Sequence, residues 1–435
     1  ILAAAAPGAC GRAPRPAAVT PADIPALESQ ARQDPGNAAV RLRLAAAYLA
    51  AGRCEPAVEH AGAGLRIAPD NVLGPLVIGA CQEREARYDL AAATYGAFLD
   101  RYPRARGVAA LRARRYQAVR QGAILAARQA LAREVELAGQ PPEPGTLAVL
   151  PVTIAGDTAF GALSRGLAEL ITTDLAVLRS IRLLERVHLG ALAAEMRLAE
   201  TGRVDPATAA RMGRLLRAEG MVQGVATIRS ERAPVRLELS VIAGDGTVRP
   251  GPQVAGPFRE LLDLQKQLVL GLGPSLGIEI TQAERERILR QGPRNLAAFL
   301  AYSQGLEALD RGDYGAAAAR FREAVRADPH FAAAEQGRQT ALAAPVVQQA
   351  TEGTVVTVVE AVQAVVVPAE PGTAGATGSA ALDVAPTLGD VVAQQTGGPV
   401  TGTDATIRQP TVETQGIVNL QGTSALIRII FRRPP

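Results

Sequence analysis

The stretch Leu147-Ala-Val-Leu-Pro-Val152, with the residues that follow it as far as Ile242, decides the fold of the middle of this chain. Apolar runs alternate there with segments whose apolar residues recur at helical spacing. The apolar runs are residues 147–152, 181–184, 221–228 and 235–242, and the helical patterns are residues 160–178, 189–199 and a third from Asp205 onward. This order of strands and helices is typical of a mixed α/β domain. We therefore predict such a domain over residues 146–280.

Local signals fix several ends of these elements. Asp205 is expected to cap the third helix, with Pro206 in its first turn and Gly220 at its end. Residues 243–247 predict a hairpin turn, followed by a strand near 248–254 and a helix at 258–270. The stretch 139–145, rich in Pro and Gly, predicts a linker before the domain.

Helical repeats flank this domain. Pro69 and Pro103 lie 34 residues apart, and each ends a pattern of two helices with small residues where the helices touch. This resembles the tetratricopeptide repeat, so we predict such repeats over residues 27–138. Residues 106–121 are expected to be the first helix of a third unit, and a helical stretch at 123–137 is expected to complete or cap it. After Gly292-Pro293 the pattern returns and predicts one further unit over residues 293–343, with Phe331 beginning a capping helix.

Four stretches of the middle domain carry a more specific resemblance: Leu147-Ala-Val-Leu-Pro, residues 165–175, Leu184-Glu-Arg-Val187 and residues 205–224. They look like the CsgG-like family of bacterial lipoproteins, which includes the curli secretion component and shares its layout with the N-terminal domain of TolB. The resemblance implies an adaptor for envelope export or assembly rather than an enzyme. Because this domain lacks paired alternating segments of about ten residues, we expect no membrane pore. The fold class predicted is an α+β multidomain protein.

The composition argues against nucleic-acid binding. The net charge is only +4, and arginines supply nearly all the positive charge without clustering, since Lys266 is the sole lysine. Aromatic residues make up 3% of the chain, which leaves few platforms for stacking bases. The three cysteines form no CxxC pair and the three histidines are scattered, so neither a metal nor a cofactor is expected.

The first residues resemble the end of an export signal, since an apolar run is followed by small residues. Gly8-Ala9-Cys10 resembles a lipoprotein box, in which Cys10 would be lipidated. The alternative is an alanine-rich disordered start. We treat residues 1–26 as a signal remnant and linker. No uninterrupted apolar run of about 18 residues predicts a membrane span.

Two further features of the N-terminal repeats are candidates for function. Cys54 and Cys81 fall on helices that stacked repeats bring together, so they form either a disulfide or two buried thiols. The register places four leucines on the first helices of the pairs, where they would line a groove for a partner helix or peptide. These are Leu42, Leu49, Leu73 and Leu76. The alternative is that they pack against residues 14–30 or the third unit.

Residues 344–435 predict a low-complexity tail. Within it, residues 354–367 are strongly β-prone, and residues 417–420 and 426–431 are candidates for a terminal hairpin. Gly273-Pro-Ser-Leu-Gly277 matches the GxSxG pattern of hydrolases, but a predicted helix precedes it where the nucleophile elbow needs a strand. No catalytic residue is therefore predicted.

These observations predict a non-enzymatic scaffold of the periplasm, held at the outer membrane if Cys10 carries a lipid. Its partners would be proteins or peptides bound by the repeats, and a homo-oligomer remains open. The alternative is a cytoplasmic regulatory module in which a TolB-like domain is joined to docking repeats.

Overall fold

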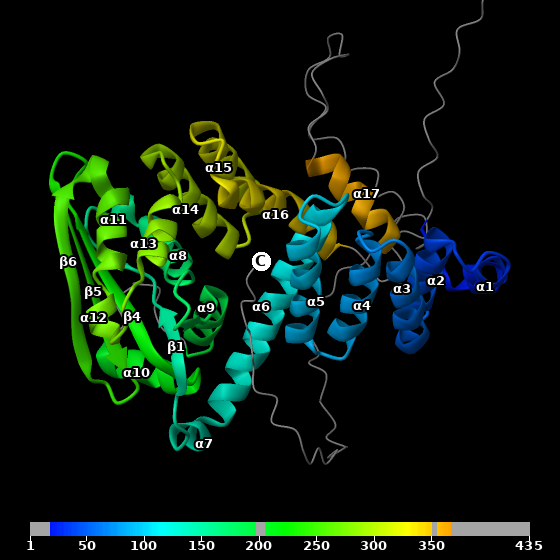
Figure 1. Cartoon of the computed structure of the whole chain (residues 1–435), viewed down its shortest axis with the longest axis horizontal. Coiled ribbons are helices and arrows are strands. Elements are labelled where there is room, and N and C mark those ends of the chain that lie inside the picture. The colour runs from blue at the N-terminus through cyan, green and yellow to red at the C-terminus, as the bar shows by residue number, and fades with distance from the viewer. Residues whose placement is uncertain (1–17, 197–204, 350–354, 367–435) are drawn as a thin grey trace, which may run out of the picture. The chain divides into compact units, whose positions relative to one another are not determined.

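The computed structural model describes residues 18–196, 205–349 and 355–366, all within one unit of the chain (Figure 1). Cys10 and the predicted terminal hairpin lie outside these ranges. Within them, helices precede and follow one sheet in the sequence. None of the described helices is both long and apolar enough to cross a membrane.

The N-terminal helices follow the predicted pairing for two full repeats. Their bounds are η1 Pro21–Asp23, α1 Ile24–Gln33, α2 Ala38–Ala50, α3 Cys54–Ile67, α4 Leu73–Arg84 and α5 Tyr88–Arg101. Asn37 starts α2 because its side-chain oxygen accepts a hydrogen bond from the Val40 amide at 3.1 Å. Gly52, with φ of +74°, makes the turn from α2 to α3. Because η1 and the first residues of α1 fall within residues 1–26, the predicted linker extends too far into the helices.

The third repeat departs from the prediction. Instead of two helices, α6 runs without a break over Val108–Ala132, followed by the short α7 at Glu134–Ala138. Gly122, where the predicted break lay, is helical, and a Cβ there would stand 3.1 Å from the Tyr88 Cβ of α5. Close packing on the neighbouring helix, not a turn, explains this glycine.

The sheet of the middle domain has the strand order β3-β1-β4-β5-β6, with β2 also pairing with β4. The bounds are β1 Glu143–Val149, β2 Thr153–Gly156, β3 Arg182–Leu183, β4 Ala218–Ile228, β5 Pro234–Ala243 and β6 Val248–Pro257. The strand β1 pairs in parallel with β3 and with β4, and β2 pairs in parallel with β4. The strands β4, β5 and β6 pair antiparallel as a meander. The predicted linker at 139–145 is therefore partly strand.

Helices cover both faces of this sheet. On one face, α8 (Leu163–Leu175) and α11 (Leu261–Leu270) bury leucines against Val149, Val222 and Leu237. On the other face, α9 (Arg186–Glu195) and α10 (Pro206–Leu215) form a second core that includes Leu150 of the β1 end. The long helix α6 contributes Ala127 to that second core.

Several details of the middle domain correct the sequence analysis. Asp205 caps α10 as expected, since its Oδ1 accepts a hydrogen bond from the Thr208 amide at 3.0 Å. Gly220 does not end that helix, because it lies inside β4 beside the Leu147 side chain. The strand β2 and the helices η2 Thr158–Phe160, α12 Gly273–Leu276 and α13 Gln282–Arg290 were not predicted, whereas the helix expected at 258–270 forms as η3 Phe258–Glu260 and α11. Ile288 of α13 is fully buried in the core, so the domain extends past residue 280.

The C-terminal repeat is continuous with the core of the middle domain. It consists of α14 Leu296–Asp310, α15 Tyr314–Ala327 and the capping helix α16 Ala332–Gln348. Phe299 and Phe321 of the repeat belong to the same buried cluster as the leucines of α8. Because α16 continues to Gln348 with Pro345 inside it, the predicted repeat ended five residues early.

The stretch at 354–367, predicted to be β-prone, contains a helix instead. Residues Val355–Val366 form a helix, α17, although seven of its twelve residues are valine. Valine has a modest intrinsic preference against helix, which packing routinely overrides. In α17, Val358, Val362 and Val366 recur every four residues and are buried against alanines of α6 and α16. Tertiary contact therefore decides this segment.

Candidate functional site

The helical pairs of the two repeat regions are held by the same kind of contact. A Cβ on Gly79 of α4 would stand 2.2 Å from the Tyr95 ring of α5. A Cβ on Gly305 of α14 would stand 2.6 Å from the Phe321 ring of α15. The same sequence distance separates the two partners in each pair, so both pairs interlock a glycine with an aromatic ring. Tyr95 also donates a hydrogen bond to Glu83 at 2.6 Å.

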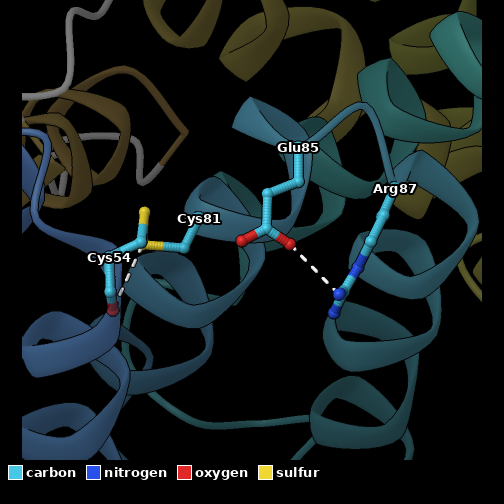
Figure 2. The surroundings of a disulfide bond; sticks show 4 residues. All are labelled: Cys54, Cys81, Glu85 and Arg87. Carbon is cyan, nitrogen blue, oxygen red and sulfur yellow. Dashed lines mark hydrogen bonds and ion pairs between the residues drawn. A yellow bond between two sulfur atoms is a disulfide. The ribbon is translucent and has the colours of Figure 1, made fainter. Parts of the chain in front are cut away.

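A disulfide joins the first two pairs. Cys54 is the first residue of α3 and Cys81 lies in α4, with their Cα atoms 5.5 Å apart (Figure 2). Cys81 is only 2% exposed, so solvent reaches this sulfur poorly in the folded array. The bond links consecutive repeats and constrains the relative position of α3 and α4.

Of the four candidate leucines, Leu42 and Leu49 are buried among the helices of the array, whereas Leu76 lies in the surface that α17 covers. Leu42 packs against Gly64 of α3, and Leu49 belongs to a cluster with Leu27 and Ala31 of α1. Leu76 belongs to the cluster that surrounds Tyr95. Leu73 alone of the four is half-buried. The alternative packing against the N-terminal segment therefore describes Leu49, because α1 covers that end of the array.

The helix α17 packs most extensively against α16, and it also packs against the first helix of each successive pair, that is, against α2, α4 and α6. Val362 is fully buried between α6 and α16, whereas Val365 is 45% exposed. Val359 packs with Val72, and a Cβ on Gly107 would stand 2.6 Å from its Cγ1. We call the surface that receives α17 the α17 site; its residues in the repeats are Val72, Leu76, Gly107, Ala109, Ala110 and Ala113, and α16 lines its other side with Ala343 and Val347. All are small or apolar, so the site accepts a helix at close range.

A cavity of about 450 Å³ lies at the other end of the array, between α1, α2 and α3. It is lined by Glu28, Ala31, Arg32, Pro35, Arg41, Leu44 and His60. Arg41 Nη1 lies 3.4 Å from His60 Nδ1, and the His60 ring stacks on Tyr48 at a centroid distance of 5.6 Å. Burial lowers the pKa of His60. The sequence does not predict this cavity, because the cavity forms only where α1 packs on α2.

A half-buried charge cluster joins the C-terminal repeat to the middle domain. Asp310 of α14 accepts hydrogen bonds from Arg165 of α8, at 2.9 Å, and from Arg186 of α9. Arg186 also reaches Glu169 at 3.4 Å. Burial alone would lower the pKa of Arg186, but the two carboxylates outweigh it and raise that pKa. Nearby, Gly166 approaches Ser303 so closely that a Cβ would stand 1.9 Å from its Oγ.

The sole lysine has a structural partner. Lys266 Nζ donates to both oxygens of Asp174, at 2.6 and 2.8 Å, and Gln265 donates to the same carboxylate at 2.9 Å. Burial raises the pKa of Asp174 despite these partners. The group lies between α8 and α11 beneath the sheet, with Asp174 only 2% exposed. It holds two helices together inside the core.

The GxSxG serine lacks the surroundings of a nucleophile. Ser275 lies on the short helix α12 and donates a hydrogen bond to the Pro250 carbonyl at 3.0 Å. His60 lies in the N-terminal repeats, His188 in α9 and His330 beside the C-terminal repeat. Among the described residues, no group of three or more His, Cys, Asp or Glu is arranged to hold a metal ion.

Comparisons with known proteins agree with this architecture. A family model described as curli production assembly/transport component CsgG matches residues 152–228, from the end of β1 to the end of β4. A tetratricopeptide repeat model matches residues 22–74, which include α1, α2 and α3. No curated protein matches the chain. The chain therefore joins tetratricopeptide repeats to a CsgG-like domain in an α+β multidomain protein.

Proposed function

We propose that this protein is a non-enzymatic scaffold of the bacterial cell envelope, which gathers protein partners for export, assembly or cell-wall synthesis. The repeats provide for protein binding, since stacked helical pairs are an interaction scaffold. The CsgG-like domain supports a role connected with the envelope. Export to the periplasm, with lipidation of Cys10 as its anchor, completes the proposal.

The observation that carries the location is the bond between Cys54 and Cys81. Disulfides persist in oxidising compartments such as the periplasm and are rare where glutathione and thioredoxin keep thiols reduced. A scaffold whose consecutive repeats are covalently joined fits the first environment. The competing function, a cytoplasmic regulatory module, would leave both thiols free.

The test is to fractionate cells that make the full-length protein from its own start, and to alkylate thiols before reduction. We expect the protein in the envelope fraction, with Cys54 and Cys81 protected from the alkylating reagent. A soluble cytoplasmic protein with both thiols alkylated would overturn the proposal. A Cys10→Ser variant addresses the anchor, since it should move from the membrane to the soluble periplasmic fraction if Cys10 carries a lipid.

A further inference from the structure

The helix α17 occupies the surface on which a repeat array would take a partner. It packs against α2, α4 and α6, which are the first helices of the successive pairs, while its most extensive contact is with α16. Its buried face is formed by Val358, Val362 and Val366, at 8%, 0% and 8% exposure. Helices that bind in grooves present such anchors one turn apart. The α17 site is therefore filled by a segment of the same chain in the manner of a bound helix.

The chemistry of this contact defines what the α17 site accepts. Ala109, Ala110 and Ala113 line it with methyl groups, and the Gly107 backbone lies directly under Val359. Arg112, on the same turn of α6, donates instead to Gln339 of α16 at 2.6 Å. A charge facing these alanines would be desolvated without a partner. The site thus suits a helix with small or β-branched apolar residues every four positions.

The composition of α17 makes it a weak helix by itself. Seven valines and one threonine in twelve residues disfavour an isolated helix, and a segment this short is marginal even in alanine-rich peptides. Its helical state therefore depends on the α17 site. Only five residues of sequence separate Gln349, next to α16, from Val355. Such a short connection presents α17 to the site at high effective concentration.

We propose that α17 is an internal ligand of the N-terminal repeats and that an apolar helix of a partner protein binds the α17 site by displacing it. This inference rests on the proposed function as a scaffold and names the surface and the partner chemistry. The internal helix keeps the apolar site covered while no partner is bound. A partner helix binds only molecules whose α17 site is open, so its apparent affinity falls in proportion to the fraction of open sites.

The test uses the full chain and a labelled synthetic peptide of residues 355–366 carrying terminal arginines for solubility. Val362→Asp releases α17, because a buried carboxylate would face the alanines of α6. We expect the peptide to bind V362D at least tenfold more tightly than the unchanged protein, since an internal competitor that fills the site nine-tenths of the time has that effect. Val365→Asp is the matched control, because Val365 is 45% exposed and this variant should bind like the unchanged protein.

Two further measurements keep the result interpretable. A peptide with Asp at the position of Val362 should not bind any of the three proteins. Hydrogen exchange of α2 to α5 should be the same in V362D and V365D, which shows that the repeats stay folded. Equal peptide affinity of V362D and the unchanged protein would overturn the proposal, and so would an unchanged protein that sediments as a dimer and dissociates on Val362→Asp. Either result would leave the envelope location, which fractionation tests separately, untouched.

Discussion

Removal of the Cys54–Cys81 bond tests how the N-terminal repeats are stabilised. The bond closes a loop with a sequence separation of 27 residues. In the chain-entropy treatment, opening a loop of this length restores about 12 cal/mol/K to the unfolded chain, which corresponds to about 3.5 kcal/mol at 25 °C. We therefore expect the double variant Cys54→Ser, Cys81→Ala to lose about 3–4 kcal/mol in the free energy of unfolding of this region. The free energy of unfolding of a whole protein is commonly about 5–15 kcal/mol, so this loss is large.

Hydrogen exchange followed by mass spectrometry measures this loss region by region. Amides of α3 and α4 should exchange faster in the double variant, and likewise in the unchanged protein with reductant. The helices α14 and α15 serve as an internal control, since the described C-terminal repeat contains no cysteine. A Cys10→Ser background removes the third thiol. Equal protection of α3 and α4 with and without reductant, or two free thiols in the unreduced denatured protein of that background, would refute the reasoning.

Three other expectations follow from the packing and the charges. Gly305→Val should cost about 1–3 kcal/mol of stability by forcing a side chain into Phe321, whereas the exposed control Gly315→Ala should be neutral or slightly stabilising in thermal unfolding. Burial lowers the pKa of His60 below its ordinary 6.5, so below that pH the unfolded state binds more protons than the folded state. The contribution of His60 to the stability of the array should therefore be full above about pH 6.5 and be lost as the pH falls through the folded pKa. The variant His60→Gln should show a smaller change of stability between about pH 5 and 7. Arg186→Met should cost about 2–3 kcal/mol by leaving Glu169 without its cation and Asp310 with Arg165 alone. Removal of the 67% exposed Arg128 from its pair with Glu195 should cost no more than about 1 kcal/mol in denaturant titrations.

The parts of this fold that the sequence predicts are those set by local pattern. The alternation in 235–241 predicts β5, and the Asp205-Pro206 pair predicts the start of α10. The 34-residue spacing predicts the paired helices, since Pro69 and Pro103 each follow the second helix of a pair, α3 and α5. Local patterns succeed here because the residues that decide each element lie within or beside it.

The parts that the sequence does not predict depend on distant partners. The valines of α17 favour a strand until alanines of α6, more than two hundred residues earlier, bury them in a helix. The charge cluster joins Arg186 to Asp310, which lies 124 residues away, and no pattern near either residue indicates the other. The same holds for the cavity beside His60, which exists only because α1 packs on α2. The sequence predicts the helices that carry the four leucines, but it does not predict which residues of other helices cover them.

The most direct test of the account asks whether an added helix and α17 compete for one surface. A spin label on Val365→Cys, in the Cys10→Ser background with the Cys54–Cys81 bond intact, reports on α17 from its exposed side. The account predicts a restricted spectrum in the free protein, and a shift to the spectrum of a mobile segment as the 355–366 peptide is added. A label that stays restricted while the peptide binds would show that the two helices occupy different surfaces, and it would contradict the account.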